Sequence, residues 1–541
     1  MLYVKRNDFK SIKEVVEYNT GMSAEEFTVD VRDGFIKNLD NAVKFAKEFL
    51  KTNSTSKITI VGDYDCDGIM ATGIMAIAFR LYGVEVETRL PKRFSEGYGL
   101  SEKIIDEIDE GLIITVDNGI AAVKAIEKAK KKGLSVIIID HHLPLSYTID
   151  GNKKIILPDA DVIVDPAAED ESDFSNYCGA ALAYHFARKL LPDMKLKNLL
   201  VLASIATVAD VMPLVGPNRT MVKDGLKYIN QGVSVPGLKA LLENIELTNV
   251  QESDYGFKLG PLFNAPSRMY DNGADKALAL ISSDYDNPRI KHRAAFLVKT
   301  NELRKETVKE IMKKLKNLNL EDERPLVLYD NSINEGIIGI IAGKYCESNE
   351  APVIVFTDSK ENEIKGSGRS PENVHLRETL DKVNEKHPDI FARYGGHAGA
   401  AGLSIYKDKL DDFKIAFKEA VGELPFKSDK VYYDLEADES DSFEKIVAFQ
   451  NEFAPYGQGN PMPVFHMTLD LKSGSYVRAK DSDSFSIMDK FETIKVIGYG
   501  LADKYEKIGR PLRLEMVGSF RESWFKGNRS IVFELKDFMA I

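Results

Sequence analysis

KITIVGDYDCDG at residues 57–68, LIITVDNG at 112–119 and LSVIIIDHH at 134–142 each join a short apolar run to a polar turn. The runs are rich in Ile and Val, and helical stretches are predicted between them, at 68–82 and 121–132. Continuous apolar runs of this length are typical of strands that are buried on both faces of a parallel sheet. The sequence therefore predicts an α/β fold with a doubly wound parallel sheet.

Acidic and imidazole side chains follow all three predicted strands. They are Asp63, Asp65 and Asp67 after the first run, Asp117 after the second, and Asp140, His141 and His142 after the third. The carboxyl ends of parallel strands meet at one edge of a sheet, so we expect these groups to lie close together. Asp210 ends an apolar helix predicted over 196–211, where an unpaired carboxylate would be costly.

Carboxylates gathered in this way repel one another unless cations neutralise them. A solvated acidic turn would explain residues 63–67 alone, but it would not explain the groups in the other segments. Hard divalent ions such as Mg²⁺ or Mn²⁺ prefer oxygen ligands, and four separate segments supply enough ligands for two ions. Paired metals suit in-line attack on phosphorus, so the sequence predicts phosphoester chemistry.

Composition limits the class of protein. With 541 residues, 44% hydrophobic and 29% charged, the chain has the balance of a soluble globular protein. The sequence contains no apolar run of 18 residues or more, and its start lacks an apolar signal core, so no membrane span and a cytoplasmic location are expected. Three widely separated cysteines argue against a disulfide framework. The net charge of −12 argues against coating nucleic acid non-specifically, although a local basic channel remains compatible with it.

Four domains are expected along the chain. The parallel-sheet catalytic domain is predicted over 1–285 and an amphipathic connecting helix over 286–320. A smaller α/β domain is predicted over 321–425. Short alternating strands at 426–541 predict a β-barrel of the OB type. OB sheets bind single strands by stacking bases on aromatic side chains, and Trp524 and Phe525 are the candidates for this contact.

The motifs DYDCDG, VDNG, DHH and ATVADVMPL resemble, in order and spacing, those of the DHH phosphoesterase superfamily. Further segments resemble the RecJ family of single-strand-specific exonucleases. They are KRFSEGYGLS at 92–101, GPLFNAPSRM at 260–269, GIIGIIAG at 336–343, GSGRS at 366–370, GGHAGAAG at 395–402 and APYGQGNPMPVF at 454–465. The resemblance covers roughly residues 50–540, and it implies a DHH domain, a DHH-associated domain and an OB-fold.

The resemblance also implies roles for individual residues. Metal ligands are implied at Asp65, Asp67, Asp117, His141 and Asp210, with Asp63 and His142 as neighbours or additional ligands. Contacts to substrate phosphate are implied at Arg93, Arg268, Ser367, Arg369, Ser370 and His397. Two departures stand out, because Ile333-Asn334 replaces a common Trp-His pair and Ser267 replaces a usual Gly. For the first we expect an altered rate or end preference, not inactivity.

The expected function is that of a Mn²⁺- or Mg²⁺-dependent exonuclease that uses two ions. It would degrade single-stranded DNA from the 5′ end to 5′-mononucleotides, in DNA repair or recombination. The expected partners are single-stranded DNA and a single-strand-binding protein or helicase, with the enzyme a monomer. One alternative is a DHH phosphodiesterase for short oligonucleotides or cyclic dinucleotides. Another is a non-catalytic DNA-binding scaffold, although such proteins lose metal ligands and the key ones are present here.

Overall fold

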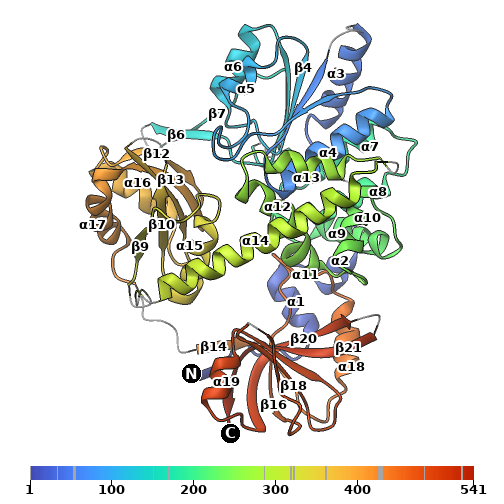
Figure 1. Cartoon of the computed structure of the whole chain (residues 1–541). Coiled ribbons are helices and arrows are strands. Elements are labelled where there is room, and N and C mark those ends of the chain that lie inside the picture. Colours follow the sequence, from blue (N-terminus) through green and yellow to red (C-terminus); the bar gives the residue numbers. More distant parts are fainter. Residues whose placement is uncertain are drawn as a thin grey trace.

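The computed structural model describes residues 2–541 with some gaps. The gaps are residues 33, 53–56, 150–151, 169–170, 285–286, 317, 319, 321–322, 360–361, 425–429, 481 and 526–527, together with the side chains of 147–149, 152–153 and 525. The described chain forms a parallel α/β unit, a smaller mixed α/β unit and a C-terminal β unit (Figure 1). The predicted fold class is therefore confirmed. Within the described residues, no helix is both long and apolar enough to cross a membrane.

The first unit is built on a five-stranded parallel sheet. Its strands are β2 (Ile58–Val61), β3 (Glu87–Arg89), β4 (Leu112–Val116), β5 (Ser135–Ile139) and β8 (Val162–Val164). Their spatial order is β3-β2-β4-β5-β8, so the order reverses at β2 and makes β2 a neighbour of β4. Doubly wound sheets bind ligands at the carboxyl ends of the strands beside such a switch point. Asp63 and Asp117 follow these two neighbouring strands.

Helices cover both faces of this sheet. Those against the sheet are α3 (Leu39–Thr52), α4 (Cys66–Leu81) and α7 (Gly179–Leu190) on one side, and α5 (Glu102–Asp106) and α6 (Val123–Lys131) on the other. The further helices of this unit pack on these helices and on one another, and they are α8 (Lys197–Ala209), α9 (Gly216–Asn230), α10 (Pro236–Asn244), α11 (Glu252–Asp254), a π-helix (Tyr255–Leu259), α12 (Gly260–Met269) and α13 (Gly273–Ile281). Ile114 packs in a core with α4 and α7, whereas its neighbour Ile113 packs in a core with α5 and α6. Burial on both faces explains why the strand sequences are apolar without alternation. A hairpin of β6 (Leu145–Ile149) and β7 (Asn152–Ile156) follows β5.

The long helix α14 (Ile290–Lys316) leads from the first unit to the second (Figure 1). The second unit contains β9 (Leu326–Tyr329), α15 (Ile338–Asn349), β10 (Val353–Asp358), β11 (Glu363–Arg369), α16 (Leu376–Lys386), β12 (Phe391–Gly396), β13 (Ala400–Tyr406), a 3₁₀ turn (Lys407–Lys409) and α17 (Leu410–Val421). Its sheet has the order β12-β13-β11-β10-β9. One face packs on α16 and α17, and the other packs on α15 and on Val308 and Leu315 of α14.

The C-terminal unit is a seven-stranded sheet in the order β15-β16-β20-β21-β19-β18-β17. Its elements are β15 (Leu435–Glu436), α18 (Phe443–Asn451), β16 (Phe465–Asp470), β17 (Val477–Arg478), β18 (Ser484–Met488), β19 (Lys495–Tyr499), α19 (Ala502–Lys507), β20 (Arg513–Phe525) and β21 (Asn528–Ala540). Strands that are not neighbours in the sheet share one core, with Met467, Phe485 and Phe533 among its members.

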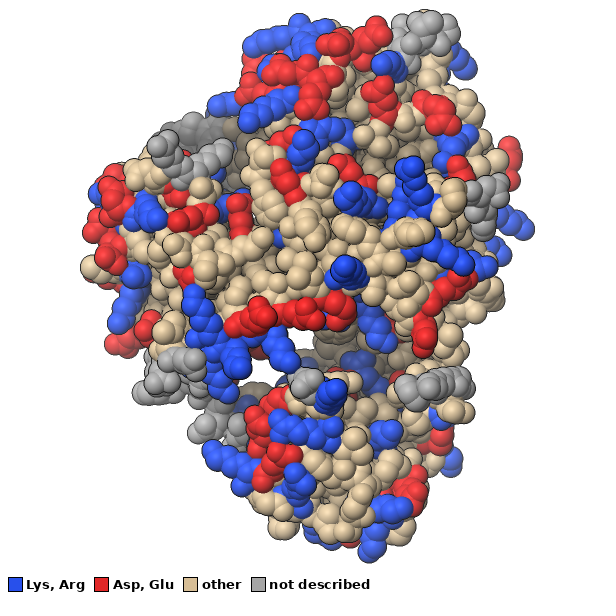
Figure 2. Space-filling view, in the orientation of Figure 1, with Lys and Arg blue, Asp and Glu red and all other residues tan. Residues whose placement is uncertain are grey.

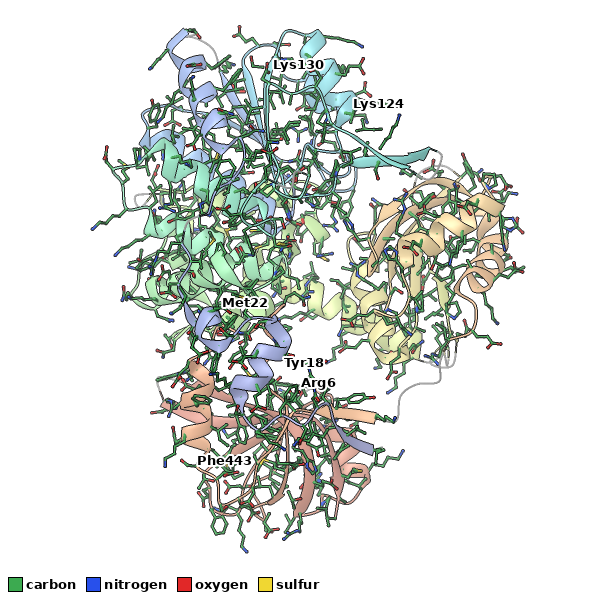
Figure 3. All side chains as sticks on the ribbon, turned by 180° about the vertical axis from the view of Figure 1, so that it is seen from behind. Arg6, Tyr18, Met22, Lys124, Lys130 and Phe443 are labelled. Carbon is green, nitrogen blue, oxygen red and sulfur yellow. The ribbon has the colours of Figure 1, made fainter. Side chains whose placement is uncertain are left out.

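The N-terminal segment packs on this C-terminal unit and not on the parallel sheet. It comprises β1 (Leu2–Lys5), α1 (Ile12–Thr20) and α2 (Ala24–Thr28), and β1 pairs in parallel with β14 (Lys430–Tyr433). Val15, Val16 and Phe27 belong to the C-terminal core. Seen from behind, α1 passes between the two units, with Arg6 beside the C-terminal sheet and Met22 beside the helices of the first unit (Figure 3). Residues 2–28 thus contact a different unit from the one predicted over 1–285, while the domain boundaries themselves stay predictions.

Arg219 of α9 joins the N-terminal segment to the C-terminal unit. Its guanidinium lies 4.6 Å from the centre of the Phe27 ring and donates hydrogen bonds to the carbonyls of Glu452 and Ala454. Arg219 is buried, so this cation–π contact forms away from solvent, where such contacts are strongest.

Phe27→Ala tests whether the N-terminal segment belongs to the C-terminal unit. We expect the free energy of unfolding of that unit to fall by about 3–5 kcal/mol, because a buried aromatic ring leaves a cavity. Trp524 is the single tryptophan and lies in this unit, so urea denaturation followed by its fluorescence reports the change. Phe35→Ala is the matched control, because Phe35 is 53% exposed, and it should change the midpoint little. Equal midpoints for both variants would contradict the assignment.

Candidate metal centre and phosphate-binding cluster

Two neighbouring strand ends carry the first acidic groups of the site. Asn118 ties the two ends together, because its side-chain amide donates to the carbonyls of Val61 and Val116 at 3.1 and 2.9 Å. Asp117 has a φ of 60°, a left-handed conformation that Asp tolerates better than most residues. A Cβ on Gly179 would lie 2.5 Å from the Cβ of Asp117, so only glycine allows α7 to begin against this carboxylate. The close approach brings α7 into the site.

Asp67 holds the start of α7. Its two carboxylate oxygens accept hydrogen bonds from the backbone N–H groups of Gly179 and Ala180, at 2.7 and 2.8 Å. The first N–H groups of a helix lack partners within it, and the N-terminus attracts negative charge. Asp65 caps α4 in the same manner, accepting from the N–H groups of Asp67 and Gly68. Two helix N-terminal ends therefore point at the acidic cluster.

Asp140 organises the turn that carries the two histidines. One of its oxygens accepts from the Ile120 N–H, and the other accepts from the N–H of His141 and contacts Nδ1 of His142 at 2.8 Å. Burial alone lowers the pKa of His142, but its hydrogen bond and ion pair with Asp140 raise that pKa to about 9. Burial lowers the pKa of His141. The pKa values of the two imidazoles are therefore shifted in opposite directions although the residues are adjacent in the sequence.

The acidic side chains lie close enough to perturb one another strongly. Burial raises the pKa of Asp63, and the adjacent Asp65 raises it further. Burial and the Asp67 carboxylate raise the pKa of Asp117 and likewise that of Asp210. Among the described residues, Oδ2 of Asp63 is buried and accepts no hydrogen bond. Buried carboxylates without partners are costly, so the site fits positively charged ligands.

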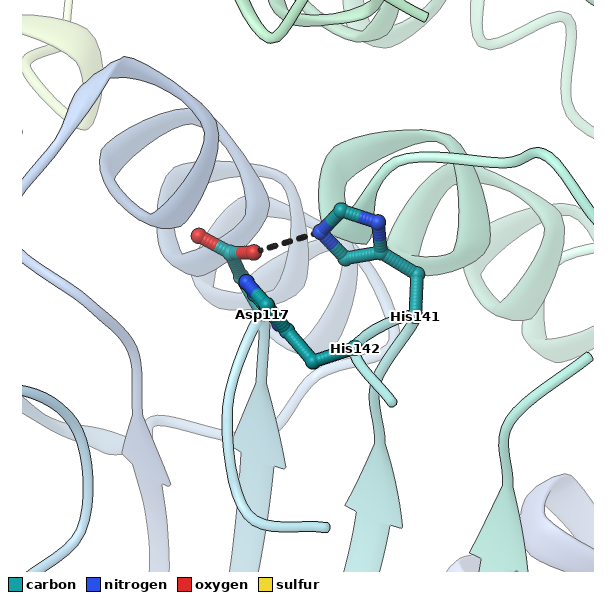
Figure 4. A group of neighbouring side chains, drawn as sticks. All are labelled: Asp117, His141 and His142. Atoms are coloured by element: carbon teal, nitrogen blue, oxygen red, sulfur yellow. Dashed lines mark hydrogen bonds and ion pairs between the residues drawn. The ribbon is translucent and has the colours of Figure 1, made fainter. Parts of the chain in front are cut away.

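Three overlapping groups of side chains have ligand atoms within 4.8 Å of one another. The groups are Asp67, His141 and Asp210; Asp63, Asp65 and Asp117; and Asp117, His141 and His142. Figure 4 shows Nε2 of His141 directed at Oδ1 of Asp117, at 3.0 Å. Asp117 is shared by two groups and so is His141. Together the groups contain all seven residues for which the sequence predicted metal ligation, and these residue types suit Mg²⁺ or Mn²⁺.

Arginines from four separate parts of the chain gather in a second cluster. Arg93 follows β3 and lies 4.5 Å from the centre of the Tyr64 ring. Arg268 of α12 donates to the carbonyl of Gly336, and Arg369 ends β11. Burial, together with the nearby charges of Arg93, Arg304 and Arg369, lowers the pKa of Arg268 to about 9. None of these four arginines has an ion-pair partner among the residues that the structure describes.

The remaining predicted phosphate contacts lie in the second unit. Arg369 donates to the carbonyl of Gly368 at 2.7 Å and to Oγ of Ser367 at 3.3 Å. The hydroxyl of Ser370 donates within its own loop, to the carbonyl of Val374. His397 is exposed just after β12, and partial burial together with the charge of His142 lowers its pKa. The hydroxyl donor of Ser370 is therefore already used within its own loop.

The two departures from the RecJ pattern have local structural roles. Asn334 accepts a hydrogen bond from the N–H of Gly336 at 2.7 Å, while Ile333 is buried in the core beside α14 and α15. Ser267 is buried and donates to the carbonyl of Asn264. The Oδ1 atom of Asn264 in turn accepts from the N–H of Cys66, between Asp65 and Asp67. Both replacements are accommodated, and the effect of Asn334 on rate stays a prediction.

The predicted stacking residues lie outside this centre. Trp524 is 37% exposed and borders two adjoining cavities of about 480 and 830 Å³ between the first unit, α14 and β20. The side chain of Phe525 lies outside the described part of the chain. Phe257 of the π-helix lines both cavities and is 83% exposed. Figure 2 shows an opening beneath α14, with Lys and Arg side chains along part of its edge.

Four residues of these sites escaped the sequence-based prediction. Tyr98 donates to the carbonyl of Asp117 and contacts His142. Asp165 is buried behind Asp140 at the end of β8, and burial with Asp140 raises its pKa to about 8. Arg304 and Phe257 belong to helices. Asp165 could have been found, because it follows a short apolar strand in the same way as Asp117, whereas nothing in the helical pattern distinguishes Arg304 or Phe257.

The sequence matches three domain families in order. They are the DHH family, N-terminal domain, over residues 57–209, the DHHA1 domain over 322–423 and the RecJ OB domain over 433–537. The single-stranded-DNA-specific exonuclease RecJ of Dickeya dadantii is 32% identical over 458 residues, which cover 79% of this chain and 77% of the relative.

Solved structures show the same architecture. RecJ from Thermus thermophilus in complex with Mn²⁺ superposes with a TM-score of 0.80 at 24% identity, covering 97% of this chain and 75% of that chain. An exonuclease RecJ bound to manganese superposes with a TM-score of 0.61 at 28% identity, covering 72% of this chain and 96% of that chain. The similarity in sequence spans most of both chains and the similarity in structure includes all three units, and so this chain belongs to the RecJ family of the DHH phosphoesterase superfamily.

Proposed function

We propose that the protein is a divalent-metal-dependent exonuclease that degrades single-stranded DNA from the 5′ end and releases 5′-mononucleotides. The observation that carries the proposal is the pairing of two unneutralised clusters, one of carboxylates and imidazoles and one of four arginines. Relatives named for single-stranded-DNA-specific exonuclease activity support the substrate, and the 28% identical RecJ structure with manganese supports the metal. A role in DNA repair or recombination follows from this substrate.

We assign two ions to the centre. One set of ligands is Asp67, His141 and Asp210. The other set is Asp63, Asp65 and Asp117, and His142 lies beside Asp117 and His141. When bound, such ions supply an activated water and stabilise charge on the phosphate oxygens during in-line displacement. Asp117 belongs to the group of Asp63 and Asp65 and also contacts His141 of the first set, so its carboxylate would lie beside both ions. The N-terminal ends of α4 and α7 fix Asp65 and Asp67 before any ion binds.

The arginine cluster provides the contact for phosphate. Guanidinium groups bind phosphate oxygens in pairs, and they do so more strongly away from water. Arg268 and Arg369 are largely shielded from solvent, and their depressed pKa values reflect that burial. A 5′-terminal phosphate carries more charge than an internal diester and offers one more acceptor oxygen. The cluster therefore favours the strand's 5′ end and presents the first internal linkage to the metal centre.

The alternative of a phosphodiesterase for very short oligonucleotides does not need the C-terminal unit. Trp524 and Phe257 line adjoining cavities and keep exposed aromatic faces, which suits the stacking of bases from a longer strand. Lys258 and Lys305 lie in the same lining. A non-catalytic scaffold is disfavoured by the complete set of metal-ligand residues. The longer single strand is thus the substrate that the whole surface fits best.

Thermal unfolding with and without Mn²⁺ tests the metal centre. Mn²⁺ at 100 times its dissociation constant should stabilise the wild type by about 2.7 kcal/mol, and EDTA should reverse the shift. Asp117→Asn should raise the melting temperature of the metal-free protein, because a repelled buried charge is removed, and should lose most of the Mn²⁺ response. Asp165→Asn is the control, since Asp165 is a buried carboxyl outside the three ligand groups, and it should keep the response. Unchanged stabilisation of Asp117→Asn by Mn²⁺ would exclude these ligands.

Initial rates on matched single strands with 5′-phosphate and 5′-hydroxyl ends test polarity and substrate. Wild type should prefer the 5′-phosphate and release the 5′-terminal nucleotide first, and Asp117→Asn should be inactive on both strands. Arg369→Ala should reduce the preference at least about tenfold, because a charge-assisted contact worth about 1.4 kcal/mol or more is lost. Arg377→Ala is the matched control, since Arg377 pairs with Asp381 in the same unit. First release from the 3′ end would refute the polarity.

Quenching of Trp524 fluorescence tests the path of the strand. A long single strand should quench this single tryptophan by stacking on it. Phe257→Ala should weaken binding about tenfold, since one stacked base contributes ~1–3 kcal/mol, and it should leave hydrolysis of a trinucleotide unchanged. Phe491→Ala is the control, because Phe491 is 65% exposed on the C-terminal unit but lines a different, acidic cavity. Equal affinities for the two variants would remove Phe257 from the path.

A further inference from the structure

Asn218 connects two segments of the metal centre although it belongs to none of the ligand groups. It lies in the first turn of α9 and is completely buried. Its Nδ2 donates one hydrogen bond to the carbonyl of Asn176 at 2.6 Å and another to the carbonyl of Pro213 at 3.1 Å. One amide group therefore ties together two stretches of backbone that are 37 residues apart in the sequence.

Each of the two segments leads directly to a metal-ligand position. Asn176 lies three residues before Gly179, whose N–H holds the Asp67 carboxylate. Pro213 lies three residues after Asp210, which ends α8. Between them Val211 has a φ of 57°, a conformation that is unfavourable for a β-branched residue and persists only where its surroundings enforce it. The Asp210 turn thus needs support from outside the helix that it ends.

The orientation of the Asn218 amide is fixed by its partners. Both partners are carbonyl oxygens, so only the NH₂ group can face them. The opposite atom, Oδ1, is buried without a hydrogen-bond partner among the described residues. An unsatisfied buried acceptor is unfavourable, and a hydrophobic residue at this position would avoid it. The two hydrogen bonds that Nδ2 donates offset this cost.

The C-terminal unit braces the same turn. The N–H of Leu214 donates to the carbonyl of Gln458 at 2.7 Å, in the loop PYGQGNP over 455–461. A Cβ on Gly457 would lie 2.8 Å from the Leu214 side chain, so the loop packs directly on this segment. Arg219, next to Asn218, donates to the carbonyls of Glu452 and Ala454. The first turn of α9 is therefore a junction between the metal centre and the C-terminal unit.

We propose that Asn218 is a positioning residue for the metal centre, holding Asp67 and Asp210 at the separation that one ion requires. The proposal rests on the metal centre proposed above. Groups that orient metal ligands from outside the coordination sphere commonly change metal affinity by about 10- to 100-fold when replaced. A side chain that only stabilised the fold would change unfolding without changing the affinity for metal.

Asn218→Asp is the discriminating variant, because it keeps the shape of the side chain but replaces the donating NH₂ by an oxygen. Mn²⁺ binding is measured on the full-length protein by the loss of the free-ion signal in electron paramagnetic resonance. We expect the affinity for Mn²⁺ to fall at least about tenfold. The Mn²⁺ concentration for half-maximal hydrolysis should rise in parallel, while the rate at saturating Mn²⁺ should fall less.

Asn349→Asp is the matched control. Asn349 is also completely buried and donates from Nδ2 to two backbone carbonyls, those of Leu320 and Glu323, but it lies in the second unit. The Asn349→Asp substitution should lower the melting temperature without altering the affinity for Mn²⁺. If Asn218→Asp does not fold, Asn218→Ser, which keeps one hydroxyl donor, replaces it and should show a smaller loss.

The outcomes separate the inference from the function on which it rests. Failure of the wild type to bind Mn²⁺ would refute the metal centre itself. If the wild type binds Mn²⁺ and a folded Asn218 variant binds it with the same affinity, only the positioning role of Asn218 is overturned. An equal loss of affinity in Asn349→Asp would also overturn it, because the effect would then be one of general destabilisation.

Discussion

Asp67 accepts two hydrogen bonds from the start of α7 while it lies among Asp117, Asp210 and His141. Its position depends on a balance between attraction to a helix N-terminus and repulsion by like charges. The helix gains partners for N–H groups that would otherwise have none, and the carboxylate gains a partial positive charge. Two features of the first unit make this contact possible. Gly179 lets α7 begin against Asp117, and α4 begins at Cys66, between Asp65 and Asp67.

Like charges are also gathered in the arginine cluster. Four arginines without ion-pair partners among the described residues come from the loop after β3, from α12, from α14 and from β11. Each cluster is unfavourable by itself, since burial raises the pKa of the carboxyl groups and lowers that of the arginines. On the proposed function, divalent ions at the carboxylates and a phosphate at the arginines would relieve both at once. Such preorganised charge is set when the protein folds and needs no rearrangement during the reaction.

The sequence predicted the parallel sheet and the acidic strand ends because both follow from local patterns. An apolar run that ends in Asp or His is visible without knowledge of the fold, and strand parallelism then gathers these ends at one edge. Contacts between segments far apart in the sequence, such as the pairing of Leu2 with Lys430, cannot be predicted from either segment alone. Each apolar face could pack on many other apolar faces of the chain. The prediction grouped the first 285 residues because they are consecutive in the chain. Residues 2–28 instead pack where a complementary apolar surface is available, on the C-terminal unit. Arg304 shows the same limit, since helical periodicity identifies the buried side of α14 but not the cluster that this arginine joins.

Packing of the C-terminal unit on the first unit has a consequence for how a strand can be held. That unit is fixed through the N-terminal helices, through Arg219 and through the contact of Leu214 with Gln458. The separation between the metal centre and the cavities lined by Trp524 and Phe257 is then set by the packing of the two units. A single strand that contacted both sites would need a minimum length, and shorter fragments would lose the proposed stacking contacts but still reach the proposed metal centre. On the proposed function, discrimination between long and short substrates would therefore arise from the distance between two fixed sites, without any residue that recognises length.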